Sequence, residues 1–128
     1  MKILIVGATG LLAKPVIEQL ERKGYQLCLF SRSIKNVAHF NRFESIQGDV
    51  FDIDTLSHAM QGCDAVHVTL SKVNEADAVK SVLSVARKQD LKLISFVSGA
   101  SVKDENRWFP MIDQKYLAEQ AIIESGIP

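Results

Sequence analysis

The sequence predicts an α/β fold in which a doubly wound parallel sheet of five strands, in the order 3-2-1-4-5, is covered by helices. Three observations lead to this prediction. Short apolar runs alternate with amphipathic stretches along the whole chain, which is typical of strands joined by right-handed crossovers. The first apolar run, residues 3–6, is continuous, as in a strand buried on both faces. A glycine-rich turn separates this run from the first helical stretch.

Each element follows from its local pattern. The β-branched residues and leucine of residues 3–6 predict the first strand, and the apolar face of residues 12–20 predicts a helix that ends near Gly24. Further strands are predicted at residues 25–30, 43–47, 65–70 and 91–97, and further helices at residues 53–60, 74–88 and 112–125. Residues 31–41 predict a loop with a short helix, whereas residues 98–110 are polar and show no clear period.

Length and composition indicate one domain, residues 1–128, with 47% hydrophobic residues. Fifteen basic and fifteen acidic side chains give a formal net charge of zero, which argues against nucleic acid or an anionic membrane surface as partner. The N-terminal apolar run reaches Gly7 after four residues, too short for a signal peptide or a membrane span. Cys28 and Cys63 have no CxxC spacing, and the three histidines have no ligand spacing. We therefore expect a soluble, cytoplasmic protein with reduced thiols and no metal.

Gly7, Gly10 and Ala13 lie between the first strand and the first helix. A bound pyrophosphate needs backbone N–H groups and a helix N-terminus directed at it. Gly7 permits the tight turn, Gly10 lets phosphates approach the backbone, and Ala13 allows close packing of helix on strand. An ordinary glycine-rich turn is the alternative, but the buried strand before it and the amphipathic helix after it favour dinucleotide binding.

Ser31, Arg32 and Ser33 follow the second strand, where an acidic residue would bind the adenosine ribose 2′-hydroxyl and favour NAD. No Asp or Glu occurs between Glu21 and Glu44. Arg32 can instead pair with a 2′-phosphate, with hydrogen bonds from the two serines. The sequence therefore favours NADP(H) over NAD(H), and a solvated loop arginine is the alternative.

Two further polar positions follow strands. Asp49, after the third strand, can accept a hydrogen bond from the adenine amino group, or it can be a turn residue, while Asp52 and Asp54 are expected to cap the next helix. Ser98, after the fifth strand, can contact substrate or nicotinamide, since the carboxyl ends of the strands face the ligand crevice. A simple Ser-Gly turn is the alternative for Ser98.

Lys115 is the basic residue of the last helix that can exchange a proton if its surroundings lower its pKa. Its spacing of four residues from Glu119 is also that of a routine ion pair on an exposed helix face. The spacing alone favours the surface pair.

Together these motifs resemble the atypical short-chain dehydrogenase/reductases, which have the Rossmann fold, and within them the NmrA-like and isoflavone-reductase-like branch. The resemblance rests on GATGLLA after the first strand, SRS after the second, GDVFD after the third, VSGAS after the fifth, and the closing KYLAEQAIIESGIP. It implies a diphosphate site at Gly7, Thr9, Gly10, Leu11 and Leu12, a 2′-phosphate site at Arg32, an adenine site at Asp49 and Val50, and a path under the adenosine and ribose at Thr69, Leu70 and Ser71. It also implies that Lys115 assists hydride transfer.

The sequence departs from this family at one catalytic position. Typical members use a Tyr-x-x-x-Lys pair, but Leu29 follows four residues after Tyr25, and Gln120 follows four residues after Tyr116. We expect an NADPH-dependent reductase that acts on a small carbonyl, quinone or conjugated substrate, with Lys115 and Ser98 nearest the chemistry. A non-catalytic NAD(P) sensor of the NmrA-like type is the alternative.

The chain stops after a helix, where a βαβ pattern would continue into a sixth strand. The resemblance likewise implies a substrate-binding carboxyl-terminal part that these residues do not contain. The fifth strand is then expected to present an open apolar edge, and such edges pair with other chains. We expect self-association through this edge.

Overall fold

The computed structural model describes residues 1–33, 41–70 and 74–128. It contains one five-stranded sheet in the order β3-β2-β1-β4-β5, with every pair of neighbours parallel, which confirms the predicted topology. The strands are β1 (Lys2–Val6), β2 (Gln26–Ser31), β3 (Glu44–Gln47), β4 (Ala65–Val68) and β5 (Leu93–Phe96). The helices are α1 (Ala13–Arg22), α2 (Ile53–Met60), α3 (Glu75–Lys88), the short 3₁₀ helix η2 (Asp104–Asn106) and α4 (Pro110–Ser125).

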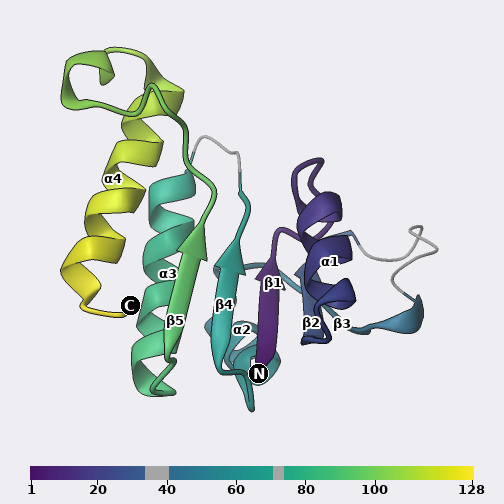
Figure 1. Cartoon of the computed structure of the whole chain (residues 1–128). Helices are drawn as coiled ribbons and strands as arrows, with labels where there is room; N and C mark the ends of the chain where they lie inside the picture. The colour runs from purple at the N-terminus through teal and green to yellow at the C-terminus, as the bar shows by residue number, and fades with distance from the viewer. Residues whose placement is uncertain (34–40, 71–73) are drawn as a thin grey trace.

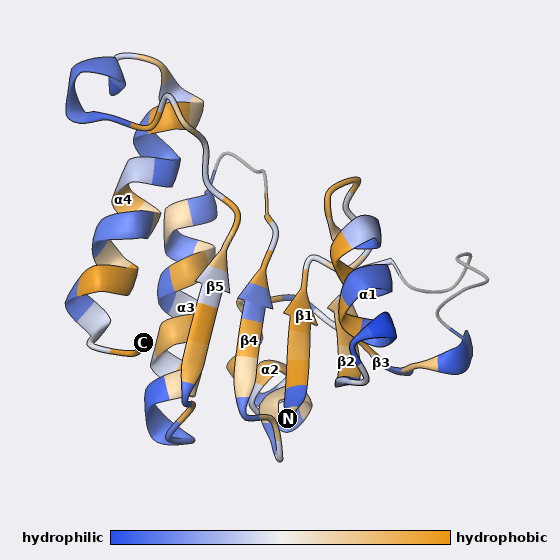
Figure 2. Cartoon of the chain, viewed as in Figure 1, coloured by the Kyte–Doolittle hydropathy of each residue, from blue (hydrophilic) through white to orange (hydrophobic). Residues whose placement is uncertain are grey.

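The sheet lies between two layers of helices, with α1 on one face and α2, α3 and α4 on the other (Figure 1). The central position of β1 in the sheet explains why residues 3–6 are all apolar. Leu4 and Val6 belong to the core on the α2–α3–α4 side, whereas Ile3 and Ile5 belong to the core under α1. Figure 2 shows the same feature as apolar colour along most of β1.

All five strands point the same way, so their carboxyl ends meet at one edge of the sheet (Figure 1). The register pairs Val6 with both Phe30 and Val68, and Val68 with Phe96. The turns that follow β1, β2 and β4 therefore begin side by side. This edge is where a doubly wound sheet binds its ligands.

Several element boundaries differ from the sequence-based prediction. Strand β4 stops at Val68, two residues earlier than predicted. Strand β5 covers only Leu93–Phe96. It starts later than predicted because Leu91 closes the turn after α3, where its N–H donates to the Ala86 carbonyl at 3.1 Å. Helix α4 begins at Pro110, two residues earlier than predicted, since proline suits the first turn of a helix, where no N–H is needed.

The C-terminal residues of the chain provide a hydrogen-bond partner for the outer edge of β5. The N–H of Ile94 donates to the carbonyl of Pro128 at 2.7 Å, and the C-terminus lies beside the sheet in Figure 1. Self-association through the rest of this edge stays a prediction. Within residues 1–33, 41–70 and 74–128, no helix combines the length and the apolar character needed to cross a membrane.

Gly7 makes the turn after β1 possible. Its φ of +81° lies in the left-handed region, and the N–H groups of Gly7 and Ala8 both donate to the Phe30 carbonyl, at 3.1 and 3.2 Å. A Cβ at this position would lie 2.2 Å from the Thr69 carbonyl oxygen. The turn is thus pressed against the end of β4, and only glycine fits.

We predict that Gly7→Ala destabilises the fold much more than Gly62→Ala. Gly62 also has a positive φ (+76°), but a Cβ there would meet nothing within 4 Å. The control should lose about 1–2 kcal/mol from the strained backbone alone, and Gly7→Ala about 3 kcal/mol or more because its Cβ overlaps a backbone carbonyl. Urea unfolding of both variants measures the difference, and equal losses would contradict this account of the turn.

Candidate dinucleotide-binding site

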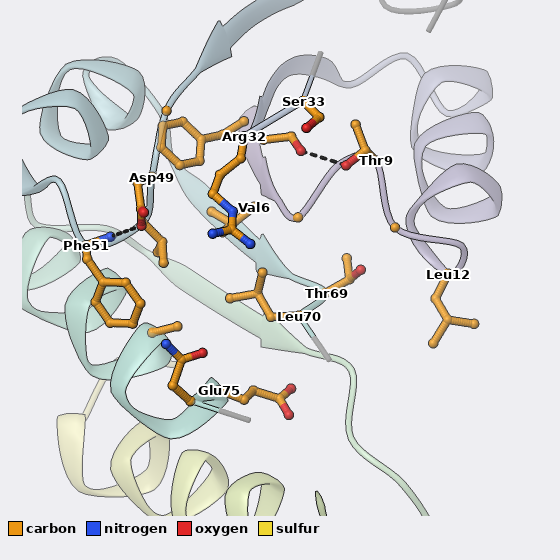
Figure 3. A pocket seen from close by; sticks show the side chains of 18 of the residues that line it. Val6, Thr9, Leu12, Arg32, Ser33, Asp49, Phe51, Thr69, Leu70 and Glu75 are labelled. Carbon is orange, nitrogen blue, oxygen red and sulfur yellow. Dashed lines mark hydrogen bonds between the residues drawn. The ribbon is translucent and has the colours of Figure 1, made fainter. Parts of the chain in front are cut away.

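A cavity of about 640 Å³ opens at the carboxyl ends of the strands (Figure 3). This volume is within the usual range for sites that hold small molecules and cofactors. Its walls come from the turns after β1, β2, β3 and β4 and from the first turn of α3. The residues that line it are Val6, Gly7, Thr9, Gly10, Leu11, Leu12, Phe30, Ser31, Arg32, Ser33, Gly48, Asp49, Val50, Phe51, Thr69, Leu70, Asn74, Glu75 and Ala78.

The glycine turn presents the start of α1 to this cavity. The N–H of Gly10 donates to the Gly7 carbonyl at 3.0 Å, and the N–H of Ala13 donates to the Gly10 carbonyl at 3.1 Å. Within the described chain, α1 has no side-chain cap, and its first turn has no acidic residue. Leu11 and Leu12 are exposed. The positive end of the helix dipole therefore faces the cavity without an internal anion, as a bound phosphate requires.

Gly10 has no side chain, which leaves room in the cavity beside the start of α1. Its φ is not in the left-handed region, and a Cβ would lie 3.2 Å from the Gly7 carbonyl oxygen, which is close but short of a collision. The absence of a side chain at Gly10 is therefore less important for the turn itself than the absence at Gly7. A side chain here would instead occupy the cavity wall, so the residues present fit a pyrophosphate.

The end of β2 is tied to the glycine turn. The hydroxyl groups of Thr9 and Ser31 are 2.6 Å apart and share a hydrogen bond. Arg32 and Ser33 are exposed, and Figure 3 shows the Arg32 side chain reaching over the cavity. In the described residues no acidic partner is recorded for Arg32, so its charge is available to a ligand anion. Lys35, the next basic residue in the sequence after Arg32, lies outside the described residues.

The sequence left open whether Asp49, after β3, is a turn residue or a residue of the binding site, and the structure places it in both settings. Its Oδ1 accepts from the Phe51 N–H at 2.9 Å, which is a turn contact, and the residue also lines the cavity. Asp52 caps α2 as predicted, accepting from the Thr55 N–H and, at 2.7 Å, from the Thr55 hydroxyl. These two hydrogen bonds hold the pKa of Asp52 below its usual value.

Beyond β4, Thr69 and Leu70 line the cavity below the glycine turn. The Thr69 N–H donates to the Val6 carbonyl at 3.0 Å, so the backbone of Thr69 is fixed to the end of β1. Ser71, the last residue expected on this path, lies outside the described residues.

The spacing of Lys115 and Glu119 predicted a surface ion pair between them, but the structure gives Lys115 other partners. Its Nζ donates to Glu75 Oε1 at 2.9 Å and to the Val97 carbonyl at 3.1 Å, and it lies 5.2 Å from the centre of the Phe96 ring. Glu119 instead accepts a hydrogen bond from the Ser98 hydroxyl. Packing of α3 against α4 thus overrides the spacing within one helix.

Glu75 is the residue that sequence reasoning missed. Its side chain is 1% exposed, and Oε2 has no hydrogen-bond partner within the described parts of the chain. Burial raises the pKa of Glu75, although the bond to Lys115 opposes this effect. An acidic residue in the first turn of a helix is usually read as a partner of the helix dipole, so no local signal marked it.

The cavity brings together all of the expected cofactor-binding residues that the structure describes. Lys115 and Ser98 are not among its lining residues, but Glu75 connects Lys115 to the wall. Ser33, which was expected to bind the 2′-phosphate, also lines the cavity, and the lining residues that the sequence did not single out as ligand contacts are Val6, Phe30, Gly48, Phe51, Asn74, Glu75 and Ala78. The described residues contain no group of three or more His, Cys, Asp or Glu side chains that could hold a metal ion.

Comparison with known proteins gives the family. Residues 7–128 match the family described as NAD(P)H-binding. The chain belongs to this NAD(P)H-binding family. Its fold and its neighbours among solved structures are those of the atypical short-chain dehydrogenase/reductase type, so the cavity is that of an NAD(P)H-binding, reductase-like domain.

Three similar proteins illustrate the relationship. The photosystem II assembly factor Ycf39 of Trieres chinensis is 27% identical over 139 aligned positions, which cover 100% of this chain and 43% of the relative. A Rossmann-fold NAD(P)-binding family protein from Shigella flexneri is 29% identical with a TM-score of 0.79, covering 98% of this chain and 62% of that one. The NADPH-dependent quinone oxidoreductase QOR2 of Escherichia coli, complexed with NADPH, is 25% identical with a TM-score of 0.84, covering 98% and 46%. The chain thus spans less than half of the curated relative's length.

We predict that Gly10→Val abolishes dinucleotide binding and leaves the fold intact. The side chain would fill the space needed by the pyrophosphate, and loss of its charge-assisted hydrogen bonds, at about 1.5–3 kcal/mol each, should weaken binding by at least about 100-fold. Gly99→Val is the matched control, because Gly99 also lacks a positive φ and its Cβ would meet nothing nearer than 3.7 Å. Cofactor titration with circular dichroism measures both effects. A folded Gly10→Val protein that still binds would show that the phosphates lie elsewhere.

Proposed function

We propose that this chain is the NADP(H)-binding portion of a reductase that passes hydride to a small carbonyl, quinone or conjugated substrate. The observation that carries the proposal is the cavity itself. It combines an uncapped helix start behind a glycine turn with an exposed arginine at the end of β2. An NAD(P)H-binding domain with these features has a phosphate cradle and a cation for a further phosphate on the adenosine.

The preference for NADP(H) rests on charge. Arg32 lies where a carboxylate would bind the free ribose hydroxyls of NAD, and no acidic residue occurs in residues 22–43. Arginine can bind a phosphate through two parallel hydrogen bonds, and Ser33 lines the same part of the cavity. Ser31 shares its hydroxyl with Thr9, so it supports the turn in addition to any ligand contact.

When bound, the nicotinamide would supply the hydride, and the residues of this chain would orient the substrate and handle the proton. Lys115 is the residue proposed for this role, because its ammonium is held at the end of β5 by Glu75 and the Val97 carbonyl. The Ser98 hydroxyl donates a hydrogen bond to Glu119, which leaves the lone pairs of its oxygen for a ligand. Ser98 is therefore better suited to accept a hydrogen bond than to donate one.

A second candidate is a non-catalytic NAD(P)-binding protein that docks on a protein partner. Two observations favour it. The position four residues before Lys115 is Met111 rather than tyrosine, and the curated relative that matches the whole chain is named as an assembly factor rather than as a reductase.

NADPH oxidation separates the two candidates. The gene product containing residues 1–128 should oxidise NADPH in the presence of a quinone or a small conjugated carbonyl, and Lys115→Met should slow the reaction without abolishing NADPH binding. An intact protein that binds NADPH but consumes none with any such acceptor would favour the binding protein.

We predict that the protein binds NADPH about tenfold or more tightly than NADH. A charge-assisted contact between Arg32 and the 2′-phosphate contributes about 1.5–3 kcal/mol, which corresponds to this ratio. In Arg32→Ala the affinity for NADPH should fall to that for NADH, while NADH binding changes little. Arg42→Ala is the control, because Arg42 is paired with Glu21 at 2.7 Å and does not line the cavity. Equal affinities in the parent, or a preference that survives Arg32→Ala, would contradict the assignment.

A further inference from the structure

Glu75 lines the cavity, and its ion pair with Lys115 connects the cavity wall to α4. Glu75 is 1% exposed, and only its Oε1 is hydrogen-bonded, to Lys115 at 2.9 Å. Its Oε2 is buried with no partner in the residues described. A buried ion pair contributes little to stability unless both groups are fully hydrogen-bonded. Stability alone therefore does not explain this carboxylate.

Lys115, the partner of Glu75, has hydrogen-bond donors where Glu75 has acceptors. An ammonium has three N–H donors, and two of them have acceptors, Glu75 Oε1 and the Val97 carbonyl. The Lys115 side chain keeps 13% of its surface exposed. Among the residues that the structure describes, the third donor has no hydrogen-bond acceptor, and the other two hold the ammonium in place.

The start of α3 is fixed to α4 by a second contact beside this ion pair. The side-chain oxygen of Gln114 accepts from the Ala76 N–H at 3.0 Å, next to the bond between Glu75 and Lys115. Two consecutive residues of α4 therefore bind two consecutive residues of α3. This double contact sets where the Lys115 ammonium lies relative to the cavity.

The two ends of the cavity differ in the strands that form them. Arg32 and Asp49 follow β2 and β3, whereas Glu75 follows β4, and the Val97 carbonyl bound by Lys115 follows β5. Figure 3 shows Glu75 below Thr69 and Leu70, away from Asp49. A dinucleotide lies across the reversal of strand order between β1 and β4, with one half on each side. If its adenosine lies over β2 and β3, its other half lies over β4 and β5.

We propose that Glu75 is a positioning residue, which holds the Lys115 ammonium so that its free N–H donor binds the nicotinamide riboside half of the dinucleotide. This inference rests on the proposed function, because it requires a dinucleotide in the cavity. Glu75 acts through Lys115 and not on the adenosine half.

A double-mutant cycle with two ligands tests the inference. The proteins are the parent, Glu75→Gln, Lys115→Met and the double variant, in which neither charge is left unpaired. The ligands are NADPH and adenosine 2′,5′-bisphosphate, which lacks the nicotinamide riboside. Arg32→Ala is the ligand control, since it should weaken both. Glu119→Gln is the matched control for Glu75→Gln. It makes the same substitution at a different contact of α4, the one between Glu119 and Ser98.

Each single variant should bind NADPH about tenfold more weakly than the parent, the effect of one charge-assisted hydrogen bond, and bind the bisphosphate unchanged. The double variant should bind NADPH no more weakly than Lys115→Met alone, because Glu75 acts through that residue. Unchanged NADPH binding by Glu75→Gln, an equal loss for both ligands, or additive losses in the double variant would overturn the inference. A parent that binds neither ligand would instead contradict the proposed function, and the inference with it.

Discussion

The contact between the turn after β1 and the end of β4 is the constraint on which the site depends. Gly7 has a φ of +81° and no room for a Cβ against the Thr69 carbonyl, and its N–H donates to Phe30 at the end of β2. The Thr69 N–H in turn donates to Val6. The ends of β1, β2 and β4 are thereby fixed to one another. The start of α1, and with it the phosphate cradle, takes its position from this junction.

The two ends of the cavity use charge in different ways. Arg32 is exposed on a loop, which is how a protein keeps a cation available for an incoming anion. Glu75 is buried and Lys115 is partly buried between α3 and α4, where their opposite charges hold each other in a defined position. In the function that we propose, the first arrangement selects between cofactors, and the second places a donor near the reacting half of the cofactor. Both follow from the parallel sheet, which gathers segments far apart in sequence at one edge.

The fold and the glycine turn could be predicted from the sequence because both leave local patterns, namely apolar runs, helical periods and the spacing of Gly7 and Gly10. The partner of Lys115 could not, because Glu75 is 40 residues away and meets it only when α3 packs on α4. Glu119, the neighbour on the same helix, appeared to be the partner from spacing alone. Strand ends were misplaced for a related reason, since hydrogen bonds such as that between Leu91 and Ala86 follow from tertiary structure.

The central claim is that a dinucleotide binds with its pyrophosphate at the start of α1. Titration of the isotope-labelled chain with NADPH, followed by NMR at each backbone amide, tests it most directly. The account predicts the largest shifts at Gly10, Leu11 and Leu12, with smaller shifts at Ser33 and Asp49, and none at Leu93 near the amino end of β5. Saturable shifts that leave the glycine turn unchanged and gather elsewhere would contradict it.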